Sequence, residues 1–454
     1  MNMKSILCVA TSALSAMLMA SDTPEVSNVQ MSQSSTGRKV TITYQLSNAA
    51  NGAVVTLDIE TNKTGSATNN DSDWVSIGGA AVCNARGAVW RKVTSADADG
   101  NGQYTITWRP DQSWEGHKVE LANGGARAVV TAWALDNTPD YMVVDVSDGA
   151  QPNTQKYYPA EDFLPGGLLG NPAYRTSMLV MRKIMAKDVT WTMGSTTLEE
   201  QRTSTKEATH QVTLTNNYYI GLFPVTQTQW GLIQTSNSIP SYFNNASDRA
   251  MRPVERVSYN EVRNNNSVEA NATYNWPADP NPNSFLGKLR TKTGVDFDLP
   301  SEAQWEFAAR AGNGSTKWGD GSAILNTDKD RNLDELGRYE RNGGKVQNGS
   351  SYVVPAQSCD ASNGTAIVGS YASNDWGIYD MHGNVWEWCL DWYADNITAL
   401  NGAVNTTSAA NRVNRGGSWS GMAGGSRPAN RNSSFAGYQG YNIGFRIVCC
   451  AGLQ

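Results

Sequence analysis

Three carboxylates lie inside a stretch of the chain that is rich in tryptophan, residues 374–393 (NDWGIYDMHGNVWEWCLDWY). These acids are Asp380, Glu387 and Asp391, and a carboxylate buried among aromatic rings needs a compensating partner. His382 is the nearby basic candidate. Calcium also fits, because it takes carboxylate and backbone carbonyl oxygens from a loop in which glycine allows the turn. The residues alone leave two interpretations open, a calcium loop or acids in solvent around a tryptophan core.

Histidine and cysteine, the other common metal ligands, are sparse. The three histidines, His117, His210 and His382, are far apart, which excludes a histidine-rich zinc or non-haem iron site. The cysteine spacing fits no zinc motif. Apart from Cys8 near the N-terminus, an odd number of cysteines remains, so the sequence leaves any disulfide pairing open: Cys83, Cys359, Cys389, Cys449 and Cys450.

The overall composition narrows the function further. The 454 residues include 36 Lys+Arg and 42 Asp+Glu, so the formal net charge is −6. This mild acidity, with no run of Lys or Arg, argues against a nucleic-acid partner. Hydrophobic residues make up 39 % and there are 15 tryptophans, which excludes a disordered chain. Charged residues make up only 17 %, so we expect a surface of uncharged polar side chains.

The first twenty residues, MNMKSILCVATSALSAMLMA, have the pattern of a secretory signal peptide. Lys4 provides the basic start, Ile6–Met19 the apolar stretch and Ala20 a small residue for cleavage. The alternative, a membrane anchor, needs about 20 apolar residues, and this stretch is shorter and interrupted by polar residues. No later run is long enough to span a membrane. We therefore expect an exported protein that is secreted, periplasmic or on the cell surface.

Residues 22–149 predict an all-β domain of the immunoglobulin or fibronectin type. In Lys39–Leu46, apolar and polar residues alternate, and Val55, Leu57 and Ile59 repeat the pattern. Half-buried strands punctuated by Gly, Asn and Asp, with no helical stretch between them, are typical of a β-sandwich. Residues 150–177 contain Pro and Gly without periodicity and predict a linker or an edge segment leading into a second domain.

Residues 178–454 predict an α+β domain with long loops. Three helix starts match the capping box, in which the first side chain caps a backbone N–H and the fourth reaches back. They are Thr226–Gln229, Ser258–Glu261 and Ser301–Gln304. In the last of these helices, Trp305, Ala308 and Ala309 form an apolar stripe. The Gly/Asn-rich loops between the helices are long enough to indicate a functional or ion-stabilised role.

This domain resembles the formylglycine-generating-enzyme/sulfatase-modifying-factor family. The matching blocks occur in family order and include, besides residues 374–393, Leu299-Pro-Ser-Glu-Ala-Gln-Trp-Glu-Phe-Ala-Ala-Arg310, Arg415-Gly-Gly-Ser-Trp419 and Gly444-Phe-Arg446. The resemblance implies a loop-rich α+β fold related to C-type lectins. It also implies a structural calcium ion, bound by the side chains of two residues and the backbone carbonyls of two others: Asp380, Glu387, Gly383 and Val385.

The resemblance fails at the family's oxidase chemistry. That oxidase uses two cysteines after the Arg-Gly-Gly-Ser-Trp block to hold copper(I), an ion that prefers thiolates. Here the two positions are Gly421 and Ser426, and no cysteine lies between Cys389 and Cys449. We therefore predict no catalytic residue and no copper. The alternative, a formylglycine-generating oxidase acting on a sulfatase cysteine or a related side-chain oxidation, would need another metal site, for example one that recruits Cys389 or Cys449. The related sulfoxide synthases need a histidine cluster that is absent.

The segment Ser418–Asn442 instead has a composition suited to recognition, because Tyr offers rigid contact area and Ser, Gly and Asn offer adaptable hydrogen bonds. The alternative is a plain surface loop. The segment also resembles the variable proteins of diversity-generating retroelements, with Ser420–Ser426 and Asn432–Tyr441 at the diversified positions. We predict non-catalytic recognition of an extracellular protein or glycan by a C-terminal pocket, with a spacer or adhesion role as the structural alternative. The predicted pocket residues are Trp419, Arg427, Arg431, Tyr438 and Tyr441.

Overall fold

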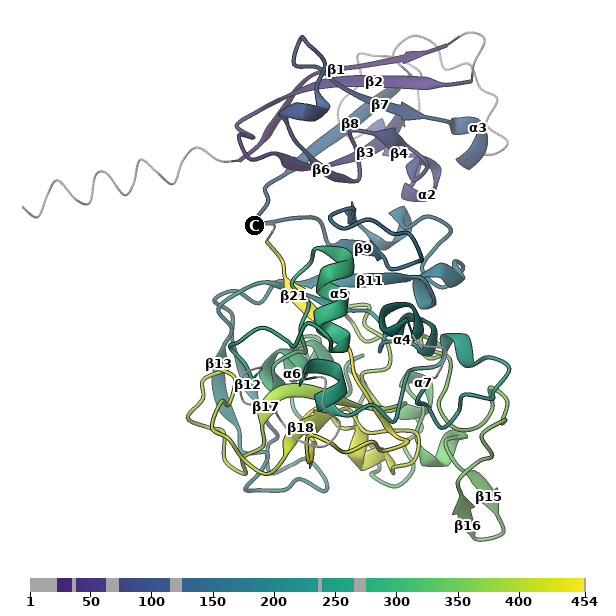
Figure 1. The fold of residues 1–454 in the computed structure, drawn as a ribbon, viewed down its shortest axis with the longest axis vertical. Helices are drawn as coiled ribbons and strands as arrows, with labels where there is room; N and C mark the ends of the chain where they lie inside the picture. The colour runs from purple at the N-terminus through teal and green to yellow at the C-terminus, as the bar shows by residue number, and fades with distance from the viewer. Residues whose placement is uncertain are drawn as a thin grey trace, which may run out of the picture. The chain divides into compact units, whose positions relative to one another are not determined.

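The computed structural model describes residues 23–34, 38–62, 73–114, 125–235, 239–264 and 275–452. The predicted signal peptide, residues 1–20, lies outside the described residues. The chain divides into two compact units (Figure 1). Unit 1 contains residues up to 141, residues 156–171 and the last three residues, and unit 2 contains residues 142–155 and 172–451. None of the helices in the described part is long and apolar enough to cross a membrane.

Unit 1 contains two antiparallel sheets. In one the strand order is β1-β2-β7-β5, and in the other it is β4-β3-β6, with β8 also paired to β3. The predicted alternation is confirmed in β2, where Val40, Ile42 and Tyr44 are buried between half-buried polar residues. The strands of unit 1 are β1 (Glu25–Gln33), β2 (Val40–Ser47), β3 (Ala53–Asn62), β4 (Trp74–Ser76), β5 (Arg86–Gly87), β6 (Arg91–Val93), β7 (Tyr104–Trp108), β8 (Ala126–Trp133) and β10 (Lys156–Tyr158), and its short helices are α2 (Gly79–Val82) and α3 (Pro110–Ser113).

Residues 150–177, predicted as a linker or an edge segment, are divided between the two units. Residues 156–171 belong to unit 1, whereas 150–155 and 172–177 belong to unit 2. Tyr158 and Phe163 are buried, and their rings lie 5.3 and 6.0 Å from the ring of Trp90. The aromatic residues account for the packing of this segment, because their burial offsets the entropy lost when a stretch rich in Pro and Gly becomes ordered.

Unit 2 combines short strands, short helices and long loops. The strands β9, β11, β14 and β21 are neighbours in one sheet, β12 pairs with β13, β15 pairs with β16, and a further sheet has the order β19-β18-β17-β20. These strands are β9 (Tyr141–Asp145), β11 (Met178–Ile184), β12 (Thr190–Met193), β13 (His210–Thr213), β14 (Tyr218–Gly221), β15 (Val346–Asn348), β16 (Ser351–Val353), β17 (Trp386–Trp392), β18 (Arg412–Arg415), β19 (Arg431–Ser434), β20 (Ile443–Gly444) and β21 (Val448–Cys450).

The helices of unit 2 begin where the capping boxes predict. Thr226 caps α4 and Ser301 caps α6, each with the reciprocal bond from the fourth residue. Ser258 and Glu261 also bond reciprocally, but the turn that follows them is a π-helix, η6 (Asn260–Asn264). Trp305 lies fully buried in the predicted stripe of α6. The α-helices are α4 (Gln227–Gln234), α5 (Phe285–Thr293), α6 (Glu302–Arg310) and α7 (Leu333–Leu336).

Candidate functional site

The C-terminal segment is attached to the rest of unit 2 by the central sheet. β18 pairs with β17 on one side and with β19 on the other, so Arg415 lies opposite both Glu387 and Arg431. Between β18 and β19 the chain forms a loop with one 3₁₀ turn, η9 (Ala423–Ser426). A second loop, residues 435–442, joins β19 to β20. These two loops carry the positions that the sequence assigned to recognition.

Buried ion pairs attach the first loop to the interior of unit 2. The Arg427 guanidinium is fully buried and binds two carboxylates, Glu207 at 2.9 and 3.0 Å and Glu199 at 2.5 Å. Its Nε donates a further hydrogen bond to the carbonyl of Gly424. These contacts compensate the desolvation of three charges, and loss of one partner from such a set costs about 3–5 kcal/mol. Arg427 therefore holds the loop in place from inside.

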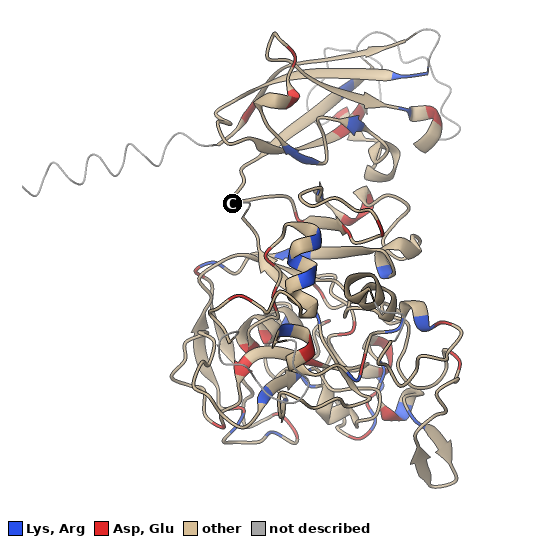
Figure 2. Ribbon diagram, in the orientation of Figure 1, with Lys and Arg blue, Asp and Glu red and all other residues tan. Residues whose placement is uncertain are grey.

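A second set of ion pairs joins α6 to the strands that flank the first loop, and Figure 2 colours the acidic and basic residues of these elements along the ribbon. Arg431 binds both oxygens of Glu302, at 2.5 and 2.8 Å. Arg415 binds Glu306, which also accepts a hydrogen bond from Arg310 at 2.8 Å. All five side chains are buried. The two glutamates lie one helical turn apart on α6, so this helix fixes both β18 and β19.

The structure divides the five residues of the predicted pocket into buried and exposed side chains. Arg427 and Arg431 point into the protein, and Trp419 is fully buried, with its indole N–H donating to the carbonyl of Tyr441 at 3.1 Å. Of the five predicted residues, Tyr438 and Tyr441 are exposed, by 39 % and 41 %. Composition could not separate these roles, because the acidic partners of the two arginines are distant in sequence.

The second loop exposes three aromatic rings, Phe435, Tyr438 and Tyr441, and the half-buried Tyr242 from another segment lies beside Tyr441; we call these four residues the aromatic face. The rings of Phe435 and Tyr438 lie 5.7 Å apart, and those of Tyr441 and Tyr242 lie 6.0 Å apart. Phe435 is 56 % exposed. Sequence analysis missed Phe435, although it lies within the predicted segment, and it missed Tyr242, which has no local signal in the sequence.

The backbone of the second loop lies against the segment that precedes η6. The Arg256 N–H donates to the Gly440 carbonyl at 3.0 Å, and the Asn260 N–H donates to the Ala436 carbonyl at 3.1 Å. The Gln439 amide donates to the Glu261 carboxylate at 2.8 Å. None of these hydrogen bonds involves the side chain of Phe435, Tyr438 or Tyr441. The loop therefore has a fixed backbone and outward-facing rings.

The two positions of the family's cysteine pair hold no reactive group. Gly421 has no side chain, and the Ser426 hydroxyl is buried without a hydrogen-bond partner among the described residues. The Ser426 carbonyl lies 3.1 Å from Nδ1 of His382, whose Nε2 accepts the Gly319 N–H at 3.0 Å. Burial lowers the pKa of His382 to about 4, so the ring is neutral. Burial also raises the pKa of the Cys389 thiol, which disfavours a thiolate.

Glu387, one of the predicted calcium ligands, is engaged in an ion pair. Its carboxylate accepts bonds from Nε and Nη2 of Arg446 at 2.7 and 2.8 Å and from the indole N–H of Trp305 at 2.6 Å. Asp380 accepts the Gly369 N–H at 2.8 Å and the Asn384 amide at 3.2 Å. N–H donors therefore already occupy both carboxylates.

These contacts do not fit a calcium ion held by two free carboxylates. In the part of the chain that the structure describes, no group of three or more His, Cys, Asp and Glu side chains could hold a metal ion. Gly383 adopts a backbone conformation with φ +107°, as expected for a glycine in a turn, and Val385 is buried. Burial raises the pKa of Asp380 to about 6. Calcium binding by these residues stays a prediction.

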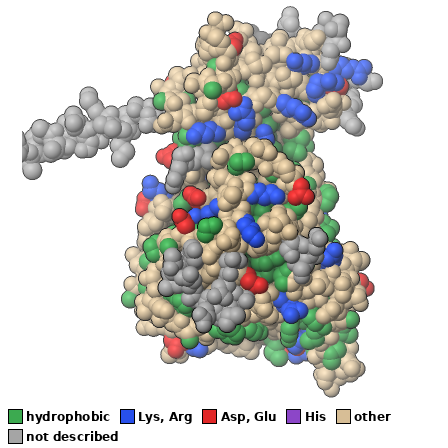
Figure 3. Space-filling view, viewed as in Figure 1, with side chains coloured by type: hydrophobic (Ala, Val, Ile, Leu, Met, Phe, Trp, Pro, Cys, Tyr) green, Lys and Arg blue, Asp and Glu red, His purple; other side chains and the backbone are tan. Residues whose placement is uncertain are grey.

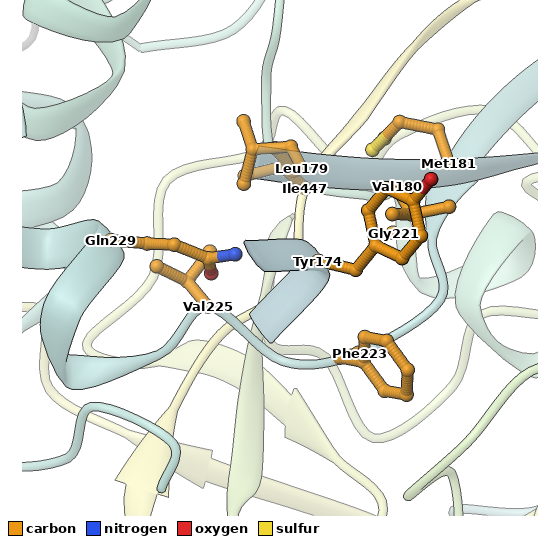
Figure 4. A pocket seen from close by; sticks show the side chains of 9 residues that line it. All are labelled: Tyr174, Leu179, Val180, Met181, Gly221, Phe223, Val225, Gln229 and Ile447. Atoms are coloured by element: carbon orange, nitrogen blue, oxygen red, sulfur yellow. The ribbon is translucent and has the colours of Figure 1, made fainter. Parts of the chain in front are cut away.

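A small apolar cavity lies elsewhere in unit 2, beside β11 and β14 (Figure 4). Its volume of about 10 Å³ is the space of one water molecule. Ligand sites for small molecules are far larger, at about 300–1,000 Å³. The cavity is therefore a packing feature, lined by Tyr174, Leu179, Val180, Met181, Gly221, Phe223, Val225, Gln229 and Ile447.

Comparison with known proteins agrees with the fold and the motifs. A model of the family described as "Sulfatase-modifying factor enzyme 1-like domain" matches residues 178–451. The chain belongs to this family, which confirms the resemblance seen in the sequence. In sequence, the chain is 28 % identical over 250 residues to Chaperone protein LppX of Paenibacillus barcinonensis, a match that covers 50 % of this chain and 81 % of the relative.

Two further similarities concern the enzyme branch and solved structures. The chain is 32 % identical over 152 residues to the formylglycine-generating enzyme of Thermomonospora curvata, a match that covers 33 % of this chain but only 42 % of that enzyme. Among solved structures, Treponema denticola variable protein 1 is 24 % identical, with a TM-score of 0.43 and coverage of 60 % of this chain and 95 % of that one.

Proposed function

We propose that this protein is exported and uses its sulfatase-modifying-factor domain for recognition rather than catalysis. One observation carries the proposal: Phe435, Tyr438 and Tyr441 are exposed on a loop whose backbone is held by hydrogen bonds to Arg256 and Asn260. Exposed aromatic residues on a pre-organised backbone gain contact area on binding at a small cost in conformational entropy. The positions of the family's copper-binding cysteines, Gly421 and Ser426, offer no thiolate.

The partner in this proposal is an extracellular protein or glycan. Charged side chains are scattered over the visible face, most of which has the colour of the backbone and of uncharged polar side chains (Figure 3). Aromatic residues and Met are enriched at protein interfaces, and Met422 in the first loop is 48 % exposed. The relative LppX is named a chaperone protein, and this name supports a protein partner for this chain.

The remaining parts of the proposal concern the accessory features. Residues 1–20 would direct export, and the two sheets of unit 1 would form an immunoglobulin- or fibronectin-like spacer. The diversified positions would be those whose side chains face solvent in the two loops, with the buried arginines as the constant frame. A near-copy of this coding segment in the neighbouring DNA, differing at adenines, is the observation that supports diversification, and its absence contradicts it.

Two assays test recognition against catalysis. In the first, the purified chain is incubated with copper(I) and a Cys-x-Pro-x-Arg peptide, and we expect neither stoichiometric copper nor turnover. In the second, the chain is applied to a glycan array and to a displayed library of protein fragments. Binding should be lost in the Tyr438→Ala/Tyr441→Ala variant and retained in Val189→Ala, an exposed position outside the two loops. Turnover of the peptide, or binding that ignores both tyrosines, would overturn the proposal.

A further inference from the structure

The hairpin β15–β16 projects from unit 2 (Figure 1). Val346 lies directly opposite Val353, so their side chains share one face of the hairpin. Val346, Val353 and the following Val354 are exposed by 38 %, 42 % and 40 %. The whole stretch 346–354, VQNGSSYVV, contains no charged residue. An exposed β-hairpin with apolar side chains and no charge lacks the charged side chains by which many proteins protect a free strand edge.

The segment that precedes this hairpin contacts the first loop, which joins β18 to β19. The Arg341 guanidinium lies 4.1 Å from the ring centre of Tyr352 and binds Asp328 at 2.8 Å. The N–H of Glu340 donates to the carbonyl of Gly421 at 2.8 Å. A two-stranded ribbon is only marginally stable by itself, so these contacts are needed to hold it out from the domain.

The hairpin also continues into the aromatic face. The hydroxyl of Tyr242 donates to the carbonyl of Pro355, the residue after Val354, at 3.3 Å. The ring of the same tyrosine lies 6.0 Å from that of Tyr441. Val354 thus immediately precedes the residue that Tyr242 contacts, and the ring of Tyr242 lies beside that of the exposed Tyr441. Tyr242 therefore links the end of the hairpin to the aromatic face, although the two lie about ninety residues apart in the numbering.

We propose that the hairpin β15–β16 is the second half of this binding surface and that it takes an extended segment of a partner protein as an added strand. Among the described residues, β15 and β16 pair with each other alone, so each leaves one row of backbone N–H and C=O groups without a neighbouring strand. A polypeptide matches that row of donors and acceptors, whereas a glycan does not repeat it. The absence of charge selects a partner segment that is itself uncharged and apolar on alternate residues.

This inference rests on the proposed recognition function, and its test separates the two. A phage-displayed library of random linear peptides is selected on the full chain, and an enriched peptide is then synthesised with a fluorophore. Its Kd is measured by anisotropy for the wild type and three variants: Val346→Lys/Val353→Lys in the hairpin, Tyr441→Ala in the aromatic face, and Val189→Lys as the matched control. Val189 is exposed by 40 %, close to the 42 % of Val353, but lies outside the surface.

We expect enriched peptides with alternating β-branched residues, a Kd raised at least about tenfold by the hairpin lysines, and no change with Val189→Lys. The hairpin side chains are exposed, so circular dichroism should show both lysine variants folded. Peptides that depend on Tyr441 but ignore the hairpin lysines would overturn the hairpin proposal and leave the recognition function standing. No enrichment, or a concentration-dependent dimer that the hairpin lysines abolish, would also overturn it, the latter because the occupant would be a second copy.

Discussion

Replacement of Glu387 by Gln distinguishes an ion pair from a calcium site at the centre of unit 2. In the structure, this carboxylate is fully buried and accepts three N–H bonds, two from Arg446 and one from Trp305. The variant keeps an acceptor oxygen for the indole but leaves the guanidinium without its counter-charge. We therefore expect a loss of stability that does not depend on calcium.

The magnitude follows from the contacts of Arg446. Removal of one partner from a buried pair costs about 3–5 kcal/mol. Arg446 also donates to the carbonyls of Gly221 and Tyr379, each at 2.9 Å, and these bonds persist in the variant. We therefore expect the lower end, about 3 kcal/mol. For a unit of this size, that corresponds to a fall in Tm of roughly 6–12 °C.

The assay is thermal and urea unfolding of the wild type and Glu387→Gln, each in excess calcium and in excess chelator. The exposed Glu335→Gln serves as a control and should change stability by less than about 0.5 kcal/mol. Addition of Arg446→Met to Glu387→Gln should cost less than the sum of the single changes, because no buried charge is left unpaired. A loss confined to the calcium buffer would refute the ion-pair reasoning and support the predicted calcium ligand.

Three further predictions concern buried polar groups and the cysteine positions. Ser426→Ala should stabilise the protein by about 1 kcal/mol in urea unfolding, because the hydroxyl is buried without a partner, and destabilisation would show an unseen hydrogen bond. Gly421→Ala should be neutral or stabilising by about 0.4–1 kcal/mol, since an added Cβ meets nothing closer than 3.9 Å, and a large loss in the same assay would contradict this. Burial raises the pKa of both Asp391 and Glu255 to about 7, so the folded state binds more protons than the unfolded state between pH 4 and 7. Their contribution to stability is present at low pH and is lost as the pH rises to about 7; Asp391→Asn should reduce that slope by up to about 1.4 kcal/mol per pH unit, and an unchanged slope would contradict the assignment.

Several features of the fold could be predicted from the sequence because local physics decides them. The capping boxes at Thr226 and Ser301 place a polar side chain within reach of its own backbone, so three or four residues suffice to define a helix start. The alternation around Val40 and Ile42 defines one face of a strand in the same way. Local composition does not show that aromatic residues such as Phe163, in the segment predicted as a linker or an edge segment, pack on a distant partner.

The candidate site shows where sequence reasoning ended. The sequence by itself determined that the chain belongs with the sulfatase-modifying-factor family and that thiols are missing at 421 and 426, since both are matters of residue identity. Only the tertiary structure decided which charges face inward. Arg427 meets Glu199 and Glu207 across 228 and 220 residues, and no periodicity in the sequence encodes such a contact. Burial and ion pairing arise from long-range packing. For this reason Arg427, which the sequence suggested as a ligand-binding residue, is a buried residue that holds the first loop in place.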